Sequence, residues 1–294
     1  MESETLRLID FSKVTDPRGN LTFIESGEHV PFRFRRNYWI YDVPGGKWRD
    51  GHAFRTADEV IVPLSGSFDV ITNDGINPSV THHLVRPDQG LFVPRLTWRS
   101  IEHFSTNAVA LVLSSTLYDP EDYIEDFQEF TEVIRRQPKT PKAVEETPEE
   151  TNDPKHNRHS TIDDCAIYEL SRHHHDNGNL TVVQNNDELP VNIQRTFYIY
   201  DVPGGAERGG HSHRACYEFI VAVSGAFDVT VTDGKRERTF TLNRPYQGLL
   251  VVPGIWRTLQ NFSSGSVCLA LASQHFDEQD YIRDYDEFLH EKQK

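Results

Sequence analysis

The 294-residue sequence has few cysteines and no long hydrophobic run. Its three cysteines, Cys165, Cys216 and Cys268, are odd in number and lack the paired spacing of a metal site, so we expect neither a disulfide framework nor a cysteine-based metal centre. No apolar stretch approaches the ~18 residues of a membrane-spanning helix, and the opening "MESETLRLIDF" lacks the pattern of a signal peptide. We therefore expect a soluble, cytoplasmic protein that does not bind membranes.

Positive charge is also scarce. The chain has 30 Lys and Arg residues against 45 Asp and Glu residues, which gives a formal net charge of −15. Proteins that bind nucleic acids usually carry a basic face that neutralises phosphates, and this sequence has no basic cluster of that size. The charge pattern argues against a nucleic-acid partner, but it allows an anionic small ligand held by a few arginines.

The sequence contains a long internal repeat. With an offset of 159, residues 35–75 match residues 194–234 at 22 of 41 positions, and the match continues at an offset of 158 to the end of each copy. A repeat of about 135 residues is much longer than the ~20–50 residues of a solenoid unit. We interpret it as a duplicated domain, with an N-terminal copy at 1–136 and a C-terminal copy at 161–294.

The segment between the copies, residues 137–160, is rich in Pro, Glu, Thr and Lys and has almost no apolar residue to bury. Such a composition does not offset the entropy that ordering costs, so we expect a flexible linker. An ordered loop on the surface is the alternative.

Within each copy the pattern indicates many short strands, among them "EVIVPLSG", "SFDVITNDG" and "GLFVP" and their counterparts. Short strands at regular spacing predict an all-β sandwich or small barrel. Each copy ends in a predicted helix. In the first, Asp119 can cap a helix that starts at Pro120 and carries Tyr123 and Ile124 on its apolar face. The run His173–His175 is expected to be a solvated loop.

The two copies differ at a pair of histidines. The later copy reads "GGHSHRACYE", and the earlier copy reads "DGHAFRTADE", with Phe54 in place of His213. Residues i and i+2 of a strand point to the same face, so His211 and His213 are expected to project together. The spacing of His211, His213, Glu218 and Gly225 resembles the first motif of the cupin superfamily.

Two imidazoles and a carboxylate are a common ligand set for iron, manganese or zinc, so His211, His213 and Glu218 form a candidate metal site. Metal-binding cupins usually add a histidine from a second motif, where this sequence has Arg257 or Thr258 in the later copy and Arg99 in the earlier one. We therefore expect no metal and no other cofactor.

A closer resemblance extends over both copies. The elements "QRTFYIYDVPGGAERGGHSHR", "RPYQGLLVVPGIW" and "ALASQHFDEQDYIRDYDEF" resemble the nucleotide-sugar 3,4-ketoisomerases, the WxcM-like C-terminal family of cupins. The opening strand of that family is matched by "DPRGNLTFIE" and less well by "DNGNLTVVQ". The resemblance implies two RmlC-like jelly-roll barrels, each closed by a helix, and metal-free isomerisation of a dTDP-4-keto-6-deoxyhexose in deoxysugar biosynthesis.

The resemblance also implies roles for individual residues. It assigns the general base to His213, proton relay or orientation to His211, and stabilisation of an enediolate to Arg195. The family tyrosine is Phe197 here, so the neighbouring Tyr198 becomes the candidate. Further candidates for substrate binding are Arg208 for the diphosphate, Tyr217 or Trp256 for the base, and Glu218 and Arg257.

The earlier copy keeps Arg36, Tyr38, His52 and Glu59, but Phe54 cannot accept a proton, so we expect a degenerate site there. Members of the family exchange N-terminal strands in homodimers, which implies an intramolecular pseudo-dimer here and possibly a further homodimer. Two other functions stay open at this point. They are a metal-dependent cupin enzyme that uses His211, His213 and Glu218, and a non-catalytic protein that binds nucleotide sugars.

Overall fold

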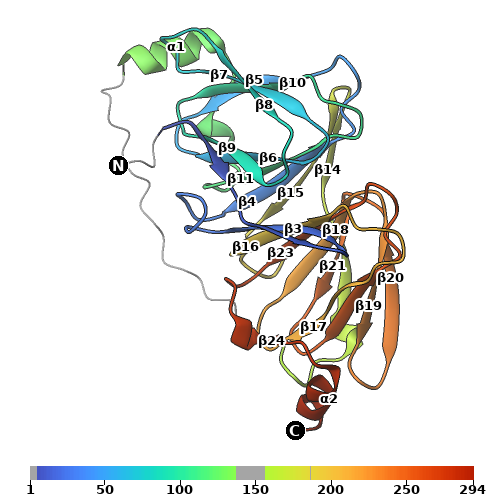
Figure 1. Cartoon of the computed structure of the whole chain (residues 1–294). Helices are drawn as coiled ribbons and strands as arrows, with labels where there is room; N and C mark the ends of the chain where they lie inside the picture. Colours follow the sequence, from blue (N-terminus) through green and yellow to red (C-terminus); the bar gives the residue numbers. More distant parts are fainter. Residues whose placement is uncertain (1–4, 137–155, 186) are drawn as a thin grey trace. The chain divides into compact units, whose positions relative to one another are not determined.

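Strands dominate the computed structural model of the chain, which describes residues 5–136, 156–185 and 187–294 (Figure 1). Contacts divide the chain into two units. The first unit contains the described residues of 1–11, 30–151 and 172–189, and the second contains those of 12–29, 152–171 and 190–294. Each unit therefore combines most of one repeat with one hairpin from the other repeat.

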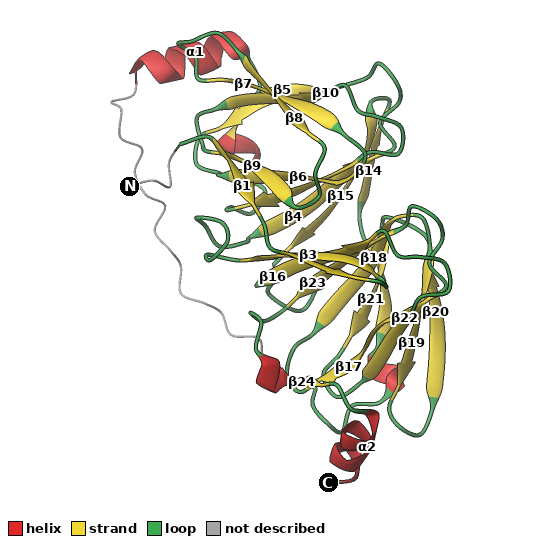
Figure 2. Cartoon of the chain, in the orientation of Figure 1, coloured by secondary structure: helices red, strands yellow, loops and turns green. Residues whose placement is uncertain are grey.

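The first unit has two antiparallel sheets (Figure 2). The seven-stranded sheet has the order β1-β9-β6-β11-β4-β15-β14, and the five-stranded sheet has the order β12-β5-β10-β7-β8. The strands are β1 (Arg7–Asp10), β4 (Arg36–Tyr41), β5 (Arg49–Phe54), β6 (Glu59–Ser65), β7 (Phe68–Asn73), β8 (Val80–Leu84), β9 (Gln89–Val93), β10 (Trp98–Glu102), β11 (Val109–Ser114), β12 (Tyr123–Ile124), β14 (Arg172–His175) and β15 (Gly178–Gln184).

The second unit repeats this arrangement, with a seven-stranded sheet in the order β13-β21-β18-β23-β16-β3-β2 and a five-stranded sheet in the order β20-β19-β22-β17-β24. The strands are β2 (Lys13–Asp16), β3 (Gly19–Glu25), β13 (Ala166–Glu169), β16 (Arg195–Tyr200), β17 (Arg208–His213), β18 (Glu218–Ser224), β19 (Phe227–Thr232), β20 (Glu237–Leu242), β21 (Gln247–Val251), β22 (Trp256–Gln260), β23 (Val267–Ala272) and β24 (Tyr281–Ile282).

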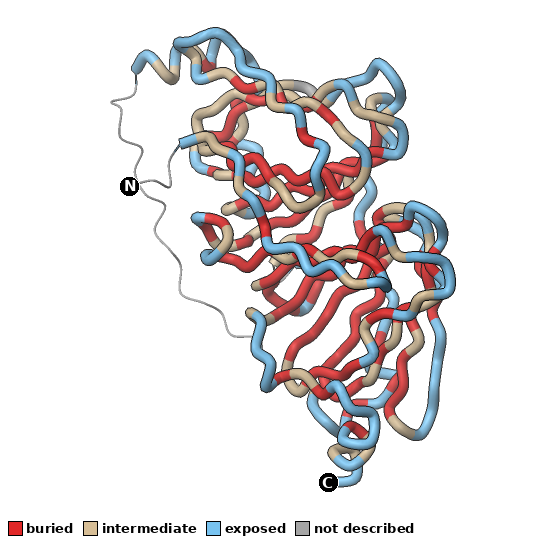
Figure 3. The backbone as a smooth tube through the Cα atoms, in the orientation of Figure 1, coloured by how far each residue is buried: buried red, intermediate tan, exposed pale blue. Residues whose placement is uncertain are grey.

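The core of each unit lies between its two sheets. In the first unit one cluster joins Tyr38, Ile61 and Val112 of the larger sheet to Phe68 and Val70 of the smaller sheet. The central strands are buried along their length, as the red segments of Figure 3 show. Burial from both sides explains why "EVIVPLSG" is a continuous apolar run. The expected all-β fold of two tandem cupin jelly rolls is confirmed.

The hairpins β2–β3 and β14–β15 are exchanged between the repeats. The strand β3, from the N-terminal repeat, pairs with β16 from Arg195↔Glu25 to Tyr200↔Asn20 (Figure 1). The strand β15 pairs in the same way with β4. Each exchanged strand covers the edge of a sheet whose backbone groups would otherwise be unpaired. The repeats and the units thus differ by one hairpin each.

The segments that close each repeat differ from the prediction. In the N-terminal repeat the expected helix is divided into a 3-10 turn, Pro120–Asp122, the strand β12, and a helix α1 (Phe127–Arg136). Asp119 caps the 3-10 turn, while Tyr123 and Ile124 pair with β5. The C-terminal repeat is the same, with 3-10 turn Glu278–Asp280, β24 and α2 (Tyr285–Gln293). Neither described helix has the length and apolar character needed to cross a membrane.

Two further expectations concern connecting segments. Most of the predicted linker, 137–160, lies outside the described residues, but its last five residues are ordered on the second unit. There the backbone N–H of His156 donates to the hydroxyl of Tyr217, and Ser160 is buried. The expectation of a solvated loop at His173–His175 was wrong, because these residues form an exposed strand, β14, that pairs with β15. A short 3-10 turn, Ile162–Asp164, precedes β13.

Candidate active site

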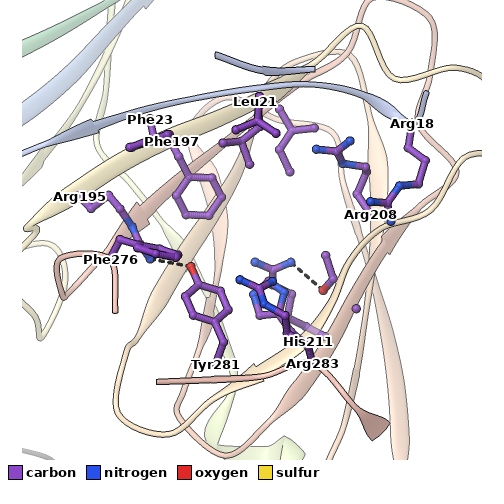
Figure 4. A pocket seen from close by; sticks show the side chains of 15 residues that line it. Arg18, Leu21, Phe23, Arg195, Phe197, Arg208, His211, Phe276, Tyr281 and Arg283 are labelled. Carbon is purple, nitrogen blue, oxygen red and sulfur yellow. Dashed lines mark hydrogen bonds between the residues drawn. The ribbon is translucent and has the colours of Figure 1, made fainter. Parts of the chain in front are cut away.

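A cavity of about 420 Å³ opens in the second unit (Figure 4). Its walls come from both repeats, because the exchanged hairpin β2–β3 forms one side. The lining residues are Val14, Arg18, Leu21 and Phe23 from that hairpin, Arg195, Phe197 and Ile199 from β16, Arg208, Gly209, Gly210 and His211 from β17, and Arg257, Phe276, Tyr281 and Arg283. The C-terminal repeat alone would lack the wall formed by the hairpin.

His211 is the histidine that faces this cavity. Its side chain is buried, and its Nε2 atom has no hydrogen-bond partner among the described residues. Burial, followed by the positive charge of Arg257, holds the pKa of His211 well below 6.5. The imidazole is therefore neutral at pH 7, which is the charge state that a general base requires.

His213 lies behind His211 and does not line the cavity. The two rings meet edge to face, with centroids 4.9 Å apart. The Nδ1 atom of His213 donates to Asp280 Oδ2 at 2.6 Å, and its Nε2 atom lies 3.2 Å from Glu218 Oε1. Burial lowers the pKa of His213, but the carboxylates of Glu218 and Asp280 outweigh it and raise the pKa above 6.5. This histidine is predominantly a cation near neutral pH.

Arg195 and Tyr281 also line the cavity, and Arg195 Nη2 donates to the hydroxyl oxygen of Tyr281 at 3.1 Å (Figure 4). Arg195 also lies over the rings of Phe197 and Phe276, each 5.7 Å from its guanidinium carbon. Burial raises the pKa of Tyr281 to about 12, so the hydroxyl keeps its proton and can donate it. The pair supplies positive charge and hydrogen-bond donors beside His211.

Arginines also gather at the other end of the cavity, where Figure 4 shows Arg18 and Arg208 together. Arg208 is buried, and its Nη1 atom donates to Asp16 Oδ1 at 3.1 Å and to the carbonyl of Gly19 at 3.0 Å. Arg18 is exposed and pairs with Asp16 at 2.7 Å. This end is suited to an anionic group, and Arg208 also fixes the hairpin to the second unit.

Glu218 and Arg257 form a buried ion pair next to the histidines. Arg257 donates from Nε and Nη2 to the two carboxylate oxygens at 2.8 and 3.0 Å, and from Nη1 to the carbonyl of Gly209 at 2.8 Å. A Cβ atom at Gly209 would collide with this guanidinium, and its φ of +65° favours glycine. The contacts are consistent with the very low pKa of Glu218.

The donor set does not fit a divalent cation. His211, His213 and Glu218 do converge, with ligand atoms within 4.8 Å of one another. However, Arg257 already binds both oxygens of Glu218 and holds its positive charge where metal-binding cupins have their fourth ligand. A cation would have to displace that guanidinium. We therefore derive no step through a metal.

The corresponding position in the first unit is closed by other side chains. The hydroxyl of Tyr38 donates to Glu59 Oε1 at 2.6 Å, and Arg99 Nη2 donates to Tyr38 and to Glu59. Phe54 packs on His52 with ring centroids 4.9 Å apart. The buried carboxylate thus has a tyrosine as its second partner in this unit and a histidine in the other.

Arg36, the counterpart of Arg195, donates from Nη1 to the hydroxyl of Tyr123 at 3.5 Å. The first unit keeps the cationic wall but has no histidine at position 54.

Besides His213 and Glu218, three predicted site residues do not line the cavity. Tyr198 is fully buried, because it lies on the face of β16 opposite to that of Phe197. The hydroxyl of Tyr217 contacts His156 at 3.0 Å, and the indole of Trp256 packs on Tyr285 and Phe288 of α2. None of the three is placed to touch a ligand in this cavity. Of the other candidates, Arg195, Arg208, His211 and Arg257 line it, and Glu218 lies behind it.

Sequence reasoning missed four residues of the site. Asp280 and Tyr281 were read as part of a helix, although the pairing of Tyr281 with His213 places them beside the histidines. Arg18 and Phe276 lie within family motifs that carry no residue role. The segment "DEQDYIRDY" was the available signal for Asp280 and Tyr281, because its Asp-Tyr-Ile core recurs in "DPEDYIEDF" of the earlier copy.

Two jelly-roll units, the second of them with a histidine and arginines around a cavity, define a double cupin. The sequence matches the family described as "FdtA: WxcM-like, C-terminal" twice, over residues 4–135 and 163–293, so the chain belongs to that family. It is 39% identical over 111 residues to the TDP-4-oxo-6-deoxy-alpha-D-glucose-3,4-oxoisomerase of Aneurinibacillus thermoaerophilus. That alignment covers 38% of this chain and 80% of the relative.

Solved structures with similar sequences carry related names. A 3,4-ketoisomerase from Helicobacter canadensis is 35% identical and aligns with 45% of this chain and 98% of its own, with a TM-score of 0.44. A sugar 3,4-ketoisomerase from Thermoanaerobacterium thermosaccharolyticum, solved with TDP, is 32% identical over 44% of this chain and 94% of its own, with a TM-score of 0.43. The expected enzyme class, an isomerase, agrees with the names of all three relatives.

Proposed function

We propose that the second unit catalyses the 3,4-ketoisomerisation of a dTDP-4-keto-6-deoxyhexose without a metal. The observation that carries this proposal is the neutral His211, which lines the same cavity as the Arg195–Tyr281 pair. Membership of the family and the name of the curated relative support the reaction and the substrate class.

The reaction moves a carbonyl from C4 to C3 of the sugar. His211 Nε2 takes the proton from C3, and the electron pair of the C3–H bond forms a C3–C4 double bond while the C4 oxygen becomes negative. Arg195 and the Tyr281 hydroxyl stabilise that enediolate oxygen, because they present fixed positive charge and a hydrogen-bond donor. The O3 proton then passes to the C4 oxygen as the C3 carbonyl forms, and the protonated His211 returns a proton to C4, which regenerates the neutral base.

This assignment exchanges the roles expected from sequence for the two histidines. His213 is protonated and lies behind the cavity wall, so it is not placed to accept the C3 proton. His211 has the position and the neutral charge state that a base requires. We infer that His213 acts on His211 rather than on the substrate.

The arginine end of the cavity is proposed to hold the diphosphate. Arg208 and Arg18 lie there, and arginine is well suited to phosphate oxygens because its donors are paired and planar. The sugar would then extend from this end toward His211 and Tyr281, which places its keto group near the histidine.

Proton NMR of the full-length protein with dTDP-4-keto-6-deoxyglucose in D2O tests the proposal. We expect the 3-keto isomer to form with solvent deuterium in the sugar, and we expect both signals to disappear in His211→Gln. Folded protein that gives neither exchange nor product over hours would contradict the proposal for this substrate. Nucleotide-sugar binding without turnover would instead indicate a binding protein.

A further inference from the structure

We propose that Asp280 is a positioning residue of the isomerase site, which fixes the orientation of the protonated His213 and thereby tunes the base His211. This inference rests on the proposed function. It assigns a task to a carboxylate that belongs to the segment closing the C-terminal repeat, outside the cupin motifs.

The contact between Asp280 and His213 is short and buried. Asp280 Oδ2 accepts from His213 Nδ1 at 2.6 Å, and the side chains are 9% and 5% exposed. An ionised carboxylate can only accept, so Nδ1 donates to Asp280, and in the cation the second N–H, on Nε2, is directed to Glu218. Asp280 therefore determines which edge of the ring faces which neighbour.

His213 has no direct access to the substrate cavity. It borders a second cavity of about 340 Å³, on the other side from the ring of His211. Any effect of His213 on the reaction must pass through its neighbours. Two neighbours connect His213 with the cavity: the ring of Tyr281, with centroids 4.3 Å apart, and the ring of His211, at 4.9 Å edge to face. The positive charge of His213 helps to lower the pKa of His211.

The first unit provides an internal comparison, because Asp122 occupies the equivalent position without a histidine. Asp122 accepts from the backbone N–H groups of Thr56 and Ala57 at 2.7 and 3.2 Å. Asp280 makes the matching contact to the N–H of Ala215 at 2.6 Å. Both aspartates therefore stabilise the same turn, and the bond to His213 is the additional contact of Asp280.

Several charged and titratable groups surround His213 and contribute to its charge state. They are His211 on its own strand, Glu218 on β18, Arg257 on β22, Asp280 and Tyr281 from the closing segment, and Arg158, His159, Arg214, Glu291 and Lys292 around the second cavity. Of these, only Glu218 and Asp280 have a side-chain atom within 3.5 Å of the imidazole nitrogens in the contacts above.

The test compares Asp280→Asn with Asp122→Asn in the full-length chain. Both variants lose one carboxylate oxygen from the same turn, but only Asp280→Asn changes the partner of a histidine. We expect kcat of Asp280→Asn to fall by about 10²-fold with little change in KM. The variant changes the orientation of His213 beside the base His211, while the cavity that binds the substrate stays intact. Asp122→Asn should keep the wild-type kcat.

The pH profile separates positioning from simple destabilisation. Without the Asp280 carboxylate, His213 loses its proton at a lower pH, and the positive charge beside His211 is then lost earlier in the profile. The basic limb of kcat/KM should therefore move to lower pH in Asp280→Asn. A variant that was only less stable would lose activity evenly across the profile. Asp280→Glu, which keeps the charge, should recover part of kcat and replaces Asp280→Asn if that variant does not fold.

Nitrogen-15 NMR of the histidine rings gives a readout that needs no substrate. The titration of His213, assigned by its absence in His213→Gln, should move to lower pH in Asp280→Asn and stay unchanged in Asp122→Asn. An unchanged His213 titration together with an unchanged basic limb would overturn the proposal. If the wild-type protein has no isomerase activity, the proposed function fails, and the NMR titration still decides whether Asp280 sets the state of His213.

Discussion

Replacing Arg208 by methionine removes the side chain that joins the exchanged hairpin β2–β3 to the second unit. Arg208 Nη1 donates to Asp16 Oδ1 at 3.1 Å and to the carbonyl of Gly19 at 3.0 Å. A hydrogen bond that involves a charged group contributes about 1.5–3 kcal/mol, and methionine avoids the cost of burying the guanidinium. We expect the free energy of opening the hairpin to fall by about 2 kcal/mol. This makes the equilibrium constant for opening about thirtyfold larger, so the amides of the hairpin should exchange about thirtyfold faster.

The assay is hydrogen exchange of β2 and β3 peptides, measured together with isomerase kinetics. Arg49→Met is the matched control, because Arg49 Nη1 makes the equivalent bonds to Asn177 Oδ1 at 2.9 Å and to the carbonyl of Gly178 at 3.4 Å in the first unit. Arg208→Met should accelerate exchange in β2–β3 and raise KM, while Arg49→Met should accelerate exchange only in β14–β15 and leave kinetics unchanged. Equal kinetic effects of the two variants would refute the reasoning.

The remaining predictions concern the base, pH, metal and chain division. His211→Gln should lower kcat by about 10³-fold, and the equivalent His52→Gln should not change it; turnover assays decide. Activity should fall below pH 6.5 as His211 gains a proton at its lowered pKa, and again above pH 6.5 as His213 loses its proton at its raised pKa; a monotonic kcat/KM profile would contradict this. Removing metals with a chelator should leave kcat unchanged, and kcat restored only by an added divalent cation would contradict the role given to Arg257. A fragment of residues 161–294 lacks β2–β3, so sedimentation should detect association or aggregation rather than a stable monomer.

The sequence predicted the parts of the fold that depend on local pattern. Continuous apolar runs such as Glu59–Ser65 became central strands because both faces are buried. The duplication, the His-x-His strand and the helix after each barrel followed from the same kind of evidence. The closing segment was harder, because Tyr281 and Ile282 occur at a spacing that suits a helical face, whereas their pairing with β17 makes them a strand.

The depth of side chains in the site could not be predicted from strand alternation. Alternation placed His211 and His213 on one face, but which of them reaches the cavity depends on β24 and on Asp280, which arrive from about 70 residues along the chain. Likewise, Arg18 became a site residue only because its hairpin joins the opposite repeat. Such long-range contacts are set by topology, and spacing in the sequence carries little information about them.

The substitutions that weaken the site lie together in the first unit, although they come from both repeats. Phe54, which replaces the second histidine, belongs to the first unit, and so does the hairpin in which Asn177 stands where the other hairpin has Arg18. The second unit combines the better-matched hairpin of the N-terminal repeat with the histidine pair of the C-terminal repeat. One well-formed site therefore draws on both repeats. Because the hairpins are exchanged, neither repeat can be lost without losing the site, and changes in Asn177 should be better tolerated than changes in Arg18.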